Sequence, residues 1–154
     1  MIMHPQIKKS ISTHGQLVLG TPDFAYSIGR SSIGQPDLIV CTGSIRTNHY
    51  LLNMVHLHLI ATDGKLGITT ELIKSNQGQP WPVEIILLER NDELLNNYVV
   101  QAEYFYECNP QYVKDTIQYA QVLLPDANGL LPHQENYDHE GFPQTLLKAV
   151  SFSQ

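Results

Sequence analysis

The stretch Phe24-Ala-Tyr-Ser-Ile-Gly29, followed by Gly34-Gln-Pro-Asp37 and Leu38-Ile-Val40, decides the fold of this chain. The first segment predicts a strand that ends at a glycine. The second predicts a tight turn, because proline fixes φ and glycine tolerates the bend. Residues 37–42 form an apolar run without alternation, which is typical of a strand buried on both faces. This region is therefore expected to form the centre of a sheet.

Further elements follow from apolar periodicity on either side of this region. Residues 77–82, with Trp81 between two prolines, predict a loop, as do residues 125–141. Strands and helices are interleaved without a regular βαβ period, which predicts an α+β fold: one compact domain with a mixed or antiparallel sheet and two main helices. The other expected elements are a hairpin over 16–29, a helix over 45–61 capped by residues 42–44, one or two strands over 66–76, a strand over 83–88, a helix between 92 and 108, and a strand over 116–124.

Length and composition limit the classes of protein. The 154 residues suit a single domain, for which we expect an N-terminal arm over residues 1–13 and a globular domain over residues 14–154. The net charge is −6 and only Lys8 and Lys9 are adjacent cations, so no nucleic-acid interface is expected. No apolar run approaches the ~20 residues of a membrane helix. Without a leader or a CxxC motif, Cys41 and Cys108 predict free thiols in a cytoplasmic protein.

Two strand ends carry candidate ligand-binding residues. At the end of the 24–29 segment, Tyr26 offers a hydroxyl and Gly29 allows a ligand close to the backbone. The simpler interpretation is that Tyr26 packs in the core and Gly29 supplies a positive φ. Near the C-terminus, Asp126 is a possible base or cation ligand with Gln121 as a hydrogen-bonding neighbour. The simpler interpretation of Asp126 is an Asx turn within Pro125-Asp-Ala-Asn-Gly129.

Two histidine-containing stretches are candidates as well. On the predicted 45–61 helix, Arg46, His49, Asn53 and His56 form one polar stripe, and Arg46 near the helix N-terminus suits a phosphate or carboxylate. The two imidazoles lie about 10 Å apart along the axis, too far to share one metal. The stripe is otherwise a solvated helix face. In residues 133–140 the weak metal candidates are His133, Asp138 and His139; the alternative is a polar surface loop.

The order of these motifs resembles the bacterial family known as domain of unknown function 4262. The similarity lies in residues 24–29, in the turn at 34–37, and in the C-terminal pattern that retains Gln121, Pro125 and Asp126. Leu124, Leu131 and His133 stand where that pattern has aromatic residues. The resemblance spans residues 14–147 and implies a family without an assigned reaction, cofactor or partner.

Two hypotheses follow for the function. The first is a domain that binds a small molecule, either anionic or neutral, in a pocket at strand ends, lined by Tyr26, Gly29, Gln121 and Asp126 and reached by Arg46. The alternative is a protein–protein interaction or accessory module, similar to an immunity protein, without catalytic activity; its exposed apolar patch is expected near Trp81 or over residues 98–106. The sequence contains no GxGxxG, Walker A, GxSxG or HExxH motif, so it indicates no particular class of enzyme.

Overall fold

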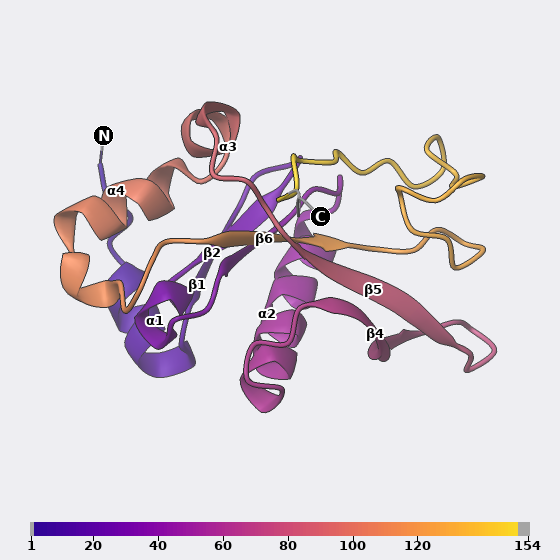
Figure 1. Ribbon diagram of the computed structural model, residues 1–154, viewed down its shortest axis with the longest axis horizontal. Coiled ribbons are helices and arrows are strands. Elements are labelled where there is room, and N and C mark those ends of the chain that lie inside the picture. Colours follow the sequence, from indigo (N-terminus) through magenta and orange to yellow (C-terminus); the bar gives the residue numbers. More distant parts are fainter. Residues whose placement is uncertain (1, 151–154) are drawn as a thin grey trace.

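The computed structural model describes residues 2–150, and its centre is one six-stranded sheet (Figure 1). The strand order is β1-β2-β3-β6-β5-β4. The predicted α+β class is confirmed, with a mixed sheet that does not close into a barrel. The strands are β1 (Leu17–Gly20), β2 (Ala25–Ile28), β3 (Asp37–Val40), β4 (Gly67–Lys74), β5 (Pro80–Leu87) and β6 (Tyr119–Leu123); the helices are α1 (Ile7–His14), α2 (Ile45–Ala61), α3 (Asp92–Asn97) and α4 (Val100–Cys108).

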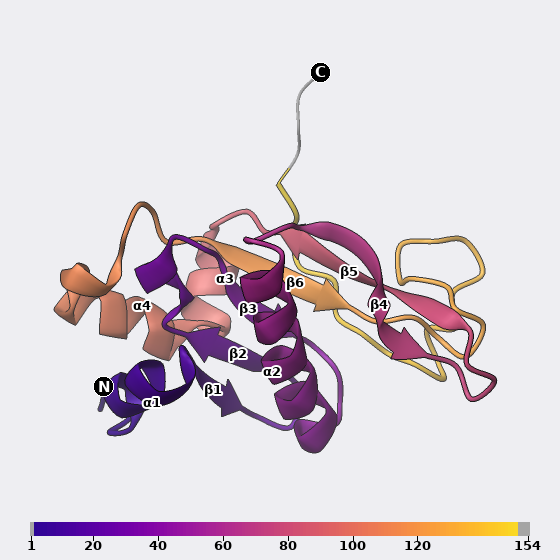
Figure 2. The same ribbon diagram turned by 90° about the horizontal axis from the view of Figure 1, so that it is seen from below.

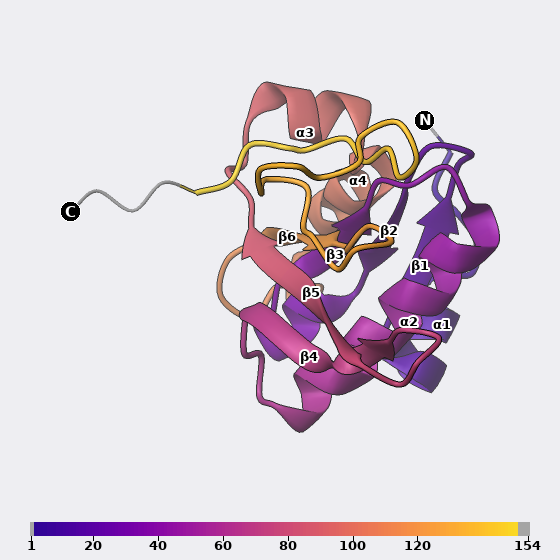
Figure 3. The same cartoon turned by 90° about the vertical axis from the view of Figure 1, so that its right-hand side faces the viewer.

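Helices cover both faces of the sheet. Helix α2 lies on one face, while α3 and α4 lie on the other (Figures 2 and 3). Helix α1, formed from the expected N-terminal arm, packs beside β1 and buries Ile7, which is 1% exposed. No helix within residues 2–150 is long and apolar enough to cross a membrane.

Strand β3 lies at the centre of the sheet, as the sequence predicts. All four of its residues are buried, and it pairs antiparallel with β2 and parallel with β6. The other ladders are antiparallel. The chain leaves β3 into α2 on one face, whereas the segment after β6 returns along the opposite face (Figure 3). At the carboxyl ends of β3 and β6, the two connections therefore diverge to opposite faces of the sheet.

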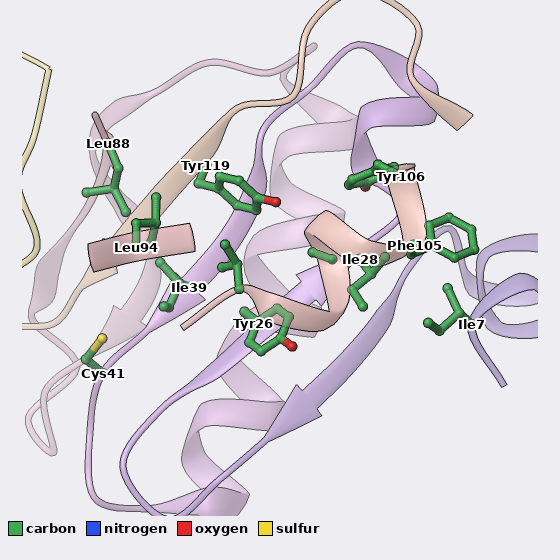
Figure 4. Close-up of a cluster of buried hydrophobic side chains, with 12 residues drawn as sticks. Ile7, Tyr26, Ile28, Ile39, Cys41, Leu88, Leu94, Phe105, Tyr106 and Tyr119 are labelled. Atoms are coloured by element: carbon green, nitrogen blue, oxygen red, sulfur yellow. The ribbon is translucent and has the colours of Figure 1, made fainter. Parts of the chain in front are cut away.

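The alternation of side chains along the strands produces two apolar cores. One lies under α2 and contains Leu38 and Val40 with Leu52, Val55 and Leu59 from the predicted core face of that helix. The other lies under α3 and α4 and is rich in aromatic residues (Figure 4). Its large members include Ile39, Phe105, Tyr106, Tyr119 and Leu94.

Two predicted boundaries are wrong for identifiable reasons. The expected 77–82 loop belongs partly to β5, which begins at Pro80. Over Pro80 and Trp81, β5 pairs only with β4, while β6 joins it from Glu84 onward, so one side of the ladder needs no N–H from proline there. The expected 92–108 helix is divided into α3 and α4, because the backbone departs from helical angles at Tyr98 (φ −125°, ψ −71°).

Candidate functional site

The amino end of β3 carries a closed polar network around Asp37. This carboxylate is fully buried, and its Oδ1 accepts hydrogen bonds from the Ser27 hydroxyl at 2.9 Å and from the backbone N–H of Arg30 at 3.0 Å. Its Oδ2 accepts from the Tyr106 hydroxyl, which itself accepts from the N–H of Gly29 at 2.7 Å. Burial raises the pKa of Asp37 to about 6, although the hydrogen bonds from Tyr106, Arg30 and Ser27 oppose that change.

The Arg30 side chain belongs to the same network and is also fully buried. Its guanidinium donates from Nε to the carbonyl of Pro36 at 2.9 Å and from its other nitrogens to Gln35 Oε1 and His56 Nδ1. Burial lowers the pKa of Arg30 to about 10, while the Asp37 charge works in the opposite direction. Arginine therefore stays charged at neutral pH. Its buried charge is solvated by protein acceptors instead of water.

His56 is the neutral member of this network. Burial, followed by the positive charge of Arg30, lowers the pKa of His56 to about 4. Because Arg30 donates to Nδ1, the imidazole proton lies on Nε2, next to the backbone of His14. The network thus connects β2, β3, α1, α2 and α4 without leaving a reactive group open to solvent, and we assign it a structural role.

The carboxyl ends of β3 and β6 are open, in contrast to that network. Two adjoining hollows of about 570 and 470 Å³ meet there, sharing Thr42, Gly43, Pro143 and Gln144. We call them together the strand-end cleft. In open sheets, ligands bind where connections from the carboxyl ends of parallel strands diverge to opposite faces. The strand-end cleft lies at that position.

The two halves of the strand-end cleft differ in chemistry. The larger half has a mixed lining, in which polar and charged side chains alternate with apolar ones; it includes Asp23, Phe24, Cys41, Asn97, Tyr98 and His139. Burial raises the pKa of the Cys41 thiol to about 12, so it is not a thiolate at neutral pH. The smaller half has an apolar wall that is made by Ile73, Trp81, Leu124, Pro125, Phe142 and Pro143.

The N-terminus of α2 borders the apolar half. Ser44 is the N-cap, and its hydroxyl accepts from the N–H of Thr47 at 3.2 Å. By helix geometry, the N–H groups of Ile45 and Arg46 have no acceptor inside the helix, and this end carries a partial positive charge. Thr42, Ser44 and Thr47 add hydroxyl groups to the same border. An apolar molecule with an acidic group therefore matches both the apolar wall and the N-terminus of α2.

The predicted site residues are not brought together. Tyr26 is buried, and its hydroxyl accepts from the N–H of Gln101 at 3.1 Å. Gly29 lies at the amino end of β3, with φ of +124°. Arg46 is exposed on the first turn of α2. Of this set, only Asp126 follows an end of the parallel strands directly, and the strand-end cleft is lined by its neighbour Pro125 instead.

Asp126 and Gln121 hold the C-terminal segment. Asp126 is fully buried and accepts from the N–H groups of Asn128 and Leu130 at Oδ1 and of Asp138 at Oδ2. Burial raises the pKa of Asp126, but these three hydrogen bonds outweigh it and leave the pKa below its ordinary value. Gln121 donates to the carbonyl of Thr145 at 2.6 Å and accepts from the N–H of Leu147 at 3.0 Å. The Asx-turn interpretation therefore describes the observed Asp126 geometry.

The three metal candidates, His133, Asp138 and His139, each contact a different residue and do not approach one another as a ligand set would. His133 Nε2 contacts Glu84 Oε1, Asp138 Oδ1 accepts from the N–H of Gly141 at 2.9 Å, and His139 packs edge-on against Tyr137 with ring centres 4.8 Å apart. Within residues 2–150, no three His, Cys, Asp or Glu side chains are grouped to hold a metal ion.

Sequence reasoning missed Thr42, Gly43 and Gln144 as site residues, although it identified residues 42–44 as a helix cap. A buried strand followed directly by a capped helix is the signal that could have indicated the cleft. Gln144 carries no such signal: its Nε2 donates to the carbonyl of Leu124 at 2.8 Å and its Oε1 accepts from the N–H of Leu124 at 3.0 Å, which only the folded chain reveals.

The chain is thus an α+β protein with two parallel strands, β3 and β6, at the centre of a mixed sheet. The connections that follow these two strands leave toward opposite faces of the sheet, and the strand-end cleft lies between them. A family model described as "Domain of unknown function (DUF4262)" matches residues 10–138, and the chain belongs to that family. No curated protein and no solved structure matches the chain.

Proposed function

We propose that this protein binds a small molecule with an apolar body and an acidic group in the strand-end cleft. The observation that carries the proposal is the pair of hollows that meet at Thr42 and Gly43, at the carboxyl ends of β3 and β6. The apolar wall around Trp81 and Phe142 takes the body of the ligand. The N-terminal turn of α2 takes the acidic group, since unpaired N–H groups and the helix dipole favour an anion.

The single tryptophan makes this proposal directly measurable. Trp81 lines the apolar half, so a bound chromophore changes its fluorescence. Anilinonaphthalene sulfonate combines an aromatic body with an anionic group and serves as the probe. We expect saturable binding at one site with energy transfer from Trp81.

Gly43 offers a blocking variant and its matched control. It borders both hollows, its φ is not positive, and a Cβ added there meets nothing within 4 Å. Gly43→Leu therefore fills the cleft, whereas Gly43→Ala adds only one methyl group. We expect loss of probe binding in Gly43→Leu and retention in Gly43→Ala, with circular dichroism unchanged in both. Undiminished binding by Gly43→Leu would contradict the proposal.

A second candidate, a protein-binding module, is favoured by the outer face of α2. Tyr50 and Leu57 are 67% and 68% exposed, and Ile60 is 50% exposed on the same helix. This differs from the patch expected near Trp81 or residues 98–106, because those side chains mostly face the core or the cleft. Affinity capture from source cells with the wild type and with Tyr50→Ser/Leu57→Ser tests it. A stoichiometric partner lost in the variant would support this candidate.

A further inference from the structure

The outer face of α2 carries exposed apolar side chains along its whole length. Tyr50, Leu57 and Ile60 are all exposed there, and so are Arg46 and Asn53. With 3.6 residues per turn, these five side chains fall within a sector of about 80° around the helix axis. Figure 2 shows α2 in front of the strands, so this sector points away from the sheet. We call these five residues the α2 ridge.

The spacing of the α2 ridge is that of a helix seam. Tyr50 and Asn53 are three residues apart, as are Leu57 and Ile60, and four residues separate Asn53 from Leu57. Single exposed apolar residues are ordinary on a protein surface, whereas alternating steps of three and four align side chains for packing against another helix. A second helix is therefore the element that covers the ridge best.

The charges at the two ends of α2 show which helix that is. Arg46 lies in the first turn, Asp63 follows the last residue, and both are exposed. Neither side chain forms an ion pair with any of residues 2–150. The helix dipole is positive at the N-terminus and negative at the C-terminus, so both charges are unfavourable within one copy. Two copies of α2 laid antiparallel place each charge against an end of opposite sign.

We propose that the protein forms a homodimer in which two copies of α2 pack antiparallel along their ridges, about a twofold axis just beyond Asn53. Residues equally far on either side of this axis face each other. Tyr50 therefore meets Leu57 of the second copy, and this contact occurs twice, as in any isologous interface. Arg46 reaches the last turn of the second α2, beside its Asp63.

Asn53 sets the register of the two helices. It lies next to the twofold axis, so the same residue of the second copy is its neighbour. An amide side chain both donates and accepts hydrogen bonds, and it is therefore complementary to a second amide. A single asparagine within an apolar helix seam favours the one register in which two such residues meet.

The interface is small, which limits the affinity. A helix of 17 residues is about 25 Å long, so the pair buries less than the ~800 Å² per partner of a standard interface. We expect a Kd of about 1–100 µM. The proposal names the partner of the protein-binding candidate and rests on that candidate. It is independent of the strand-end cleft, which Tyr50, Asn53 and Leu57 do not line.

Analytical ultracentrifugation of the full-length protein tests the proposal. Between about 1 and 500 µM, we expect the mass to rise from 17.4 kDa toward twice that value. Leu57→Ser removes an apolar contact twice in each dimer and should raise the Kd at least about tenfold. Leu146→Ser is the matched control, because Leu146 is also exposed but belongs to the segment on the opposite face of the sheet. This variant should dimerise as the wild type does.

Charge reversal tests the antiparallel arrangement. Arg46→Glu and Asp63→Lys each place like charges together and should each weaken the dimer at least about threefold. The double variant Arg46→Glu/Asp63→Lys restores opposite charges and should recover most of the lost affinity. Circular dichroism of all variants checks that they are folded.

Three results would overturn the homodimer: a wild type that stays monomeric over the whole range, a dimer unaffected by Leu57→Ser, or no recovery in the double variant. A monomeric wild type that still captures another protein through Tyr50 and Leu57 would also overturn it, while leaving the protein-binding candidate in place. Gly43→Leu should dimerise normally, because it alters only the strand-end cleft.

Discussion

The two ends of β3 use polar residues in opposite ways. At the amino end, Asp37 and Arg30 are fully buried, and each polar atom of the Asp37 carboxylate has a hydrogen-bond donor. At the carboxyl end, Thr42 and Gly43 border an open cleft. A buried carboxylate whose two oxygens both accept hydrogen bonds from the protein offers no open position to a ligand. A single strand thus separates a structural end from the end that is free to bind.

The largest expected effect on stability comes from a substitution in the polar network at the amino end of β3. Asp37→Ala leaves the hydroxyls of Tyr106 and Ser27 and the backbone N–H of Arg30 without their acceptor, and it removes the negative charge that balances the buried Arg30 guanidinium. We expect the free energy of unfolding to fall by about 3–5 kcal/mol. Urea denaturation measures it. Thr42→Ser, at the open end, is the control; it keeps the hydroxyl that donates to the buried Asn48 and should change stability by less than about 1 kcal/mol. Equal losses in the two variants would refute the contrast between the ends.

A pair of glycines tests the same contrast through the backbone. Gly29 has φ of +124°, and a Cβ there would lie 2.5 Å from Ile11 Cγ1. Gly29→Ala therefore combines backbone strain with overpacking and should lower stability by about 2–4 kcal/mol. Gly43→Ala meets no atom within 4 Å and should be nearly neutral. Thermal unfolding of both variants measures the difference; a neutral Gly29→Ala would contradict it.

A smaller effect concerns the pH dependence of the closed end. The pKa of His56 is lowered from 6.5 to about 4 in the folded protein, so the unfolded chain binds the extra proton between these values. His56 therefore lowers the free energy of unfolding as the pH falls from 6.5 to 4. The pKa of Asp37 is raised from 3.8 to about 6, so the folded state binds the extra proton there and gains stability over the same descent. The two contributions oppose each other.

His56→Gln makes this opposition visible. Glutamine can accept from Arg30 and donate toward the backbone of His14, but it does not titrate. Relative to the wild type, we expect the variant to gain about 1–2 kcal/mol of stability between pH 6.5 and 4. Urea midpoints measured at several pH values provide the comparison, in which the other titrating groups cancel. A constant difference across this range would show that His56 does not carry the predicted pKa.

The sequence alone predicted the elements that depend on local pattern. The apolar run at 37–42 indicated the central strand, and the helix over 45–61 with its cap at Ser44 is confirmed in its bounds. The two wrong boundaries, the start of β5 at Pro80 and the break between α3 and α4 at Tyr98, arise where tertiary pairing or packing overrides the local preference for a loop or for a continuous helix. Proline was tolerated in β5 because β6 does not reach that far along it.

The candidate site was harder to predict, since no single motif indicates which residues lie close together in the folded chain. Tyr26, Gly29, Gln121 and Asp126 each lie near a strand, but their polar atoms are used by Gln101, Tyr106, Thr145 and the turn at 126–130. The stripe on α2 was identified correctly as polar. Three of its members, His49, Asn53 and His56, line a hollow beside α1, and no periodicity on α2 could reveal that neighbour.

The sequence by itself determined the family, the α+β class, the buried central strand and the main helix, because apolar spacing and cap residues act over a few neighbours along the chain. Only the tertiary structure decided that β3 and β6 lie parallel and side by side, which polar residues satisfy one another, and where two hollows meet. The physical reason is that these properties arise from the pairing of segments about 80 residues apart, Asp37 with Tyr119 and Ile39 with Gln121.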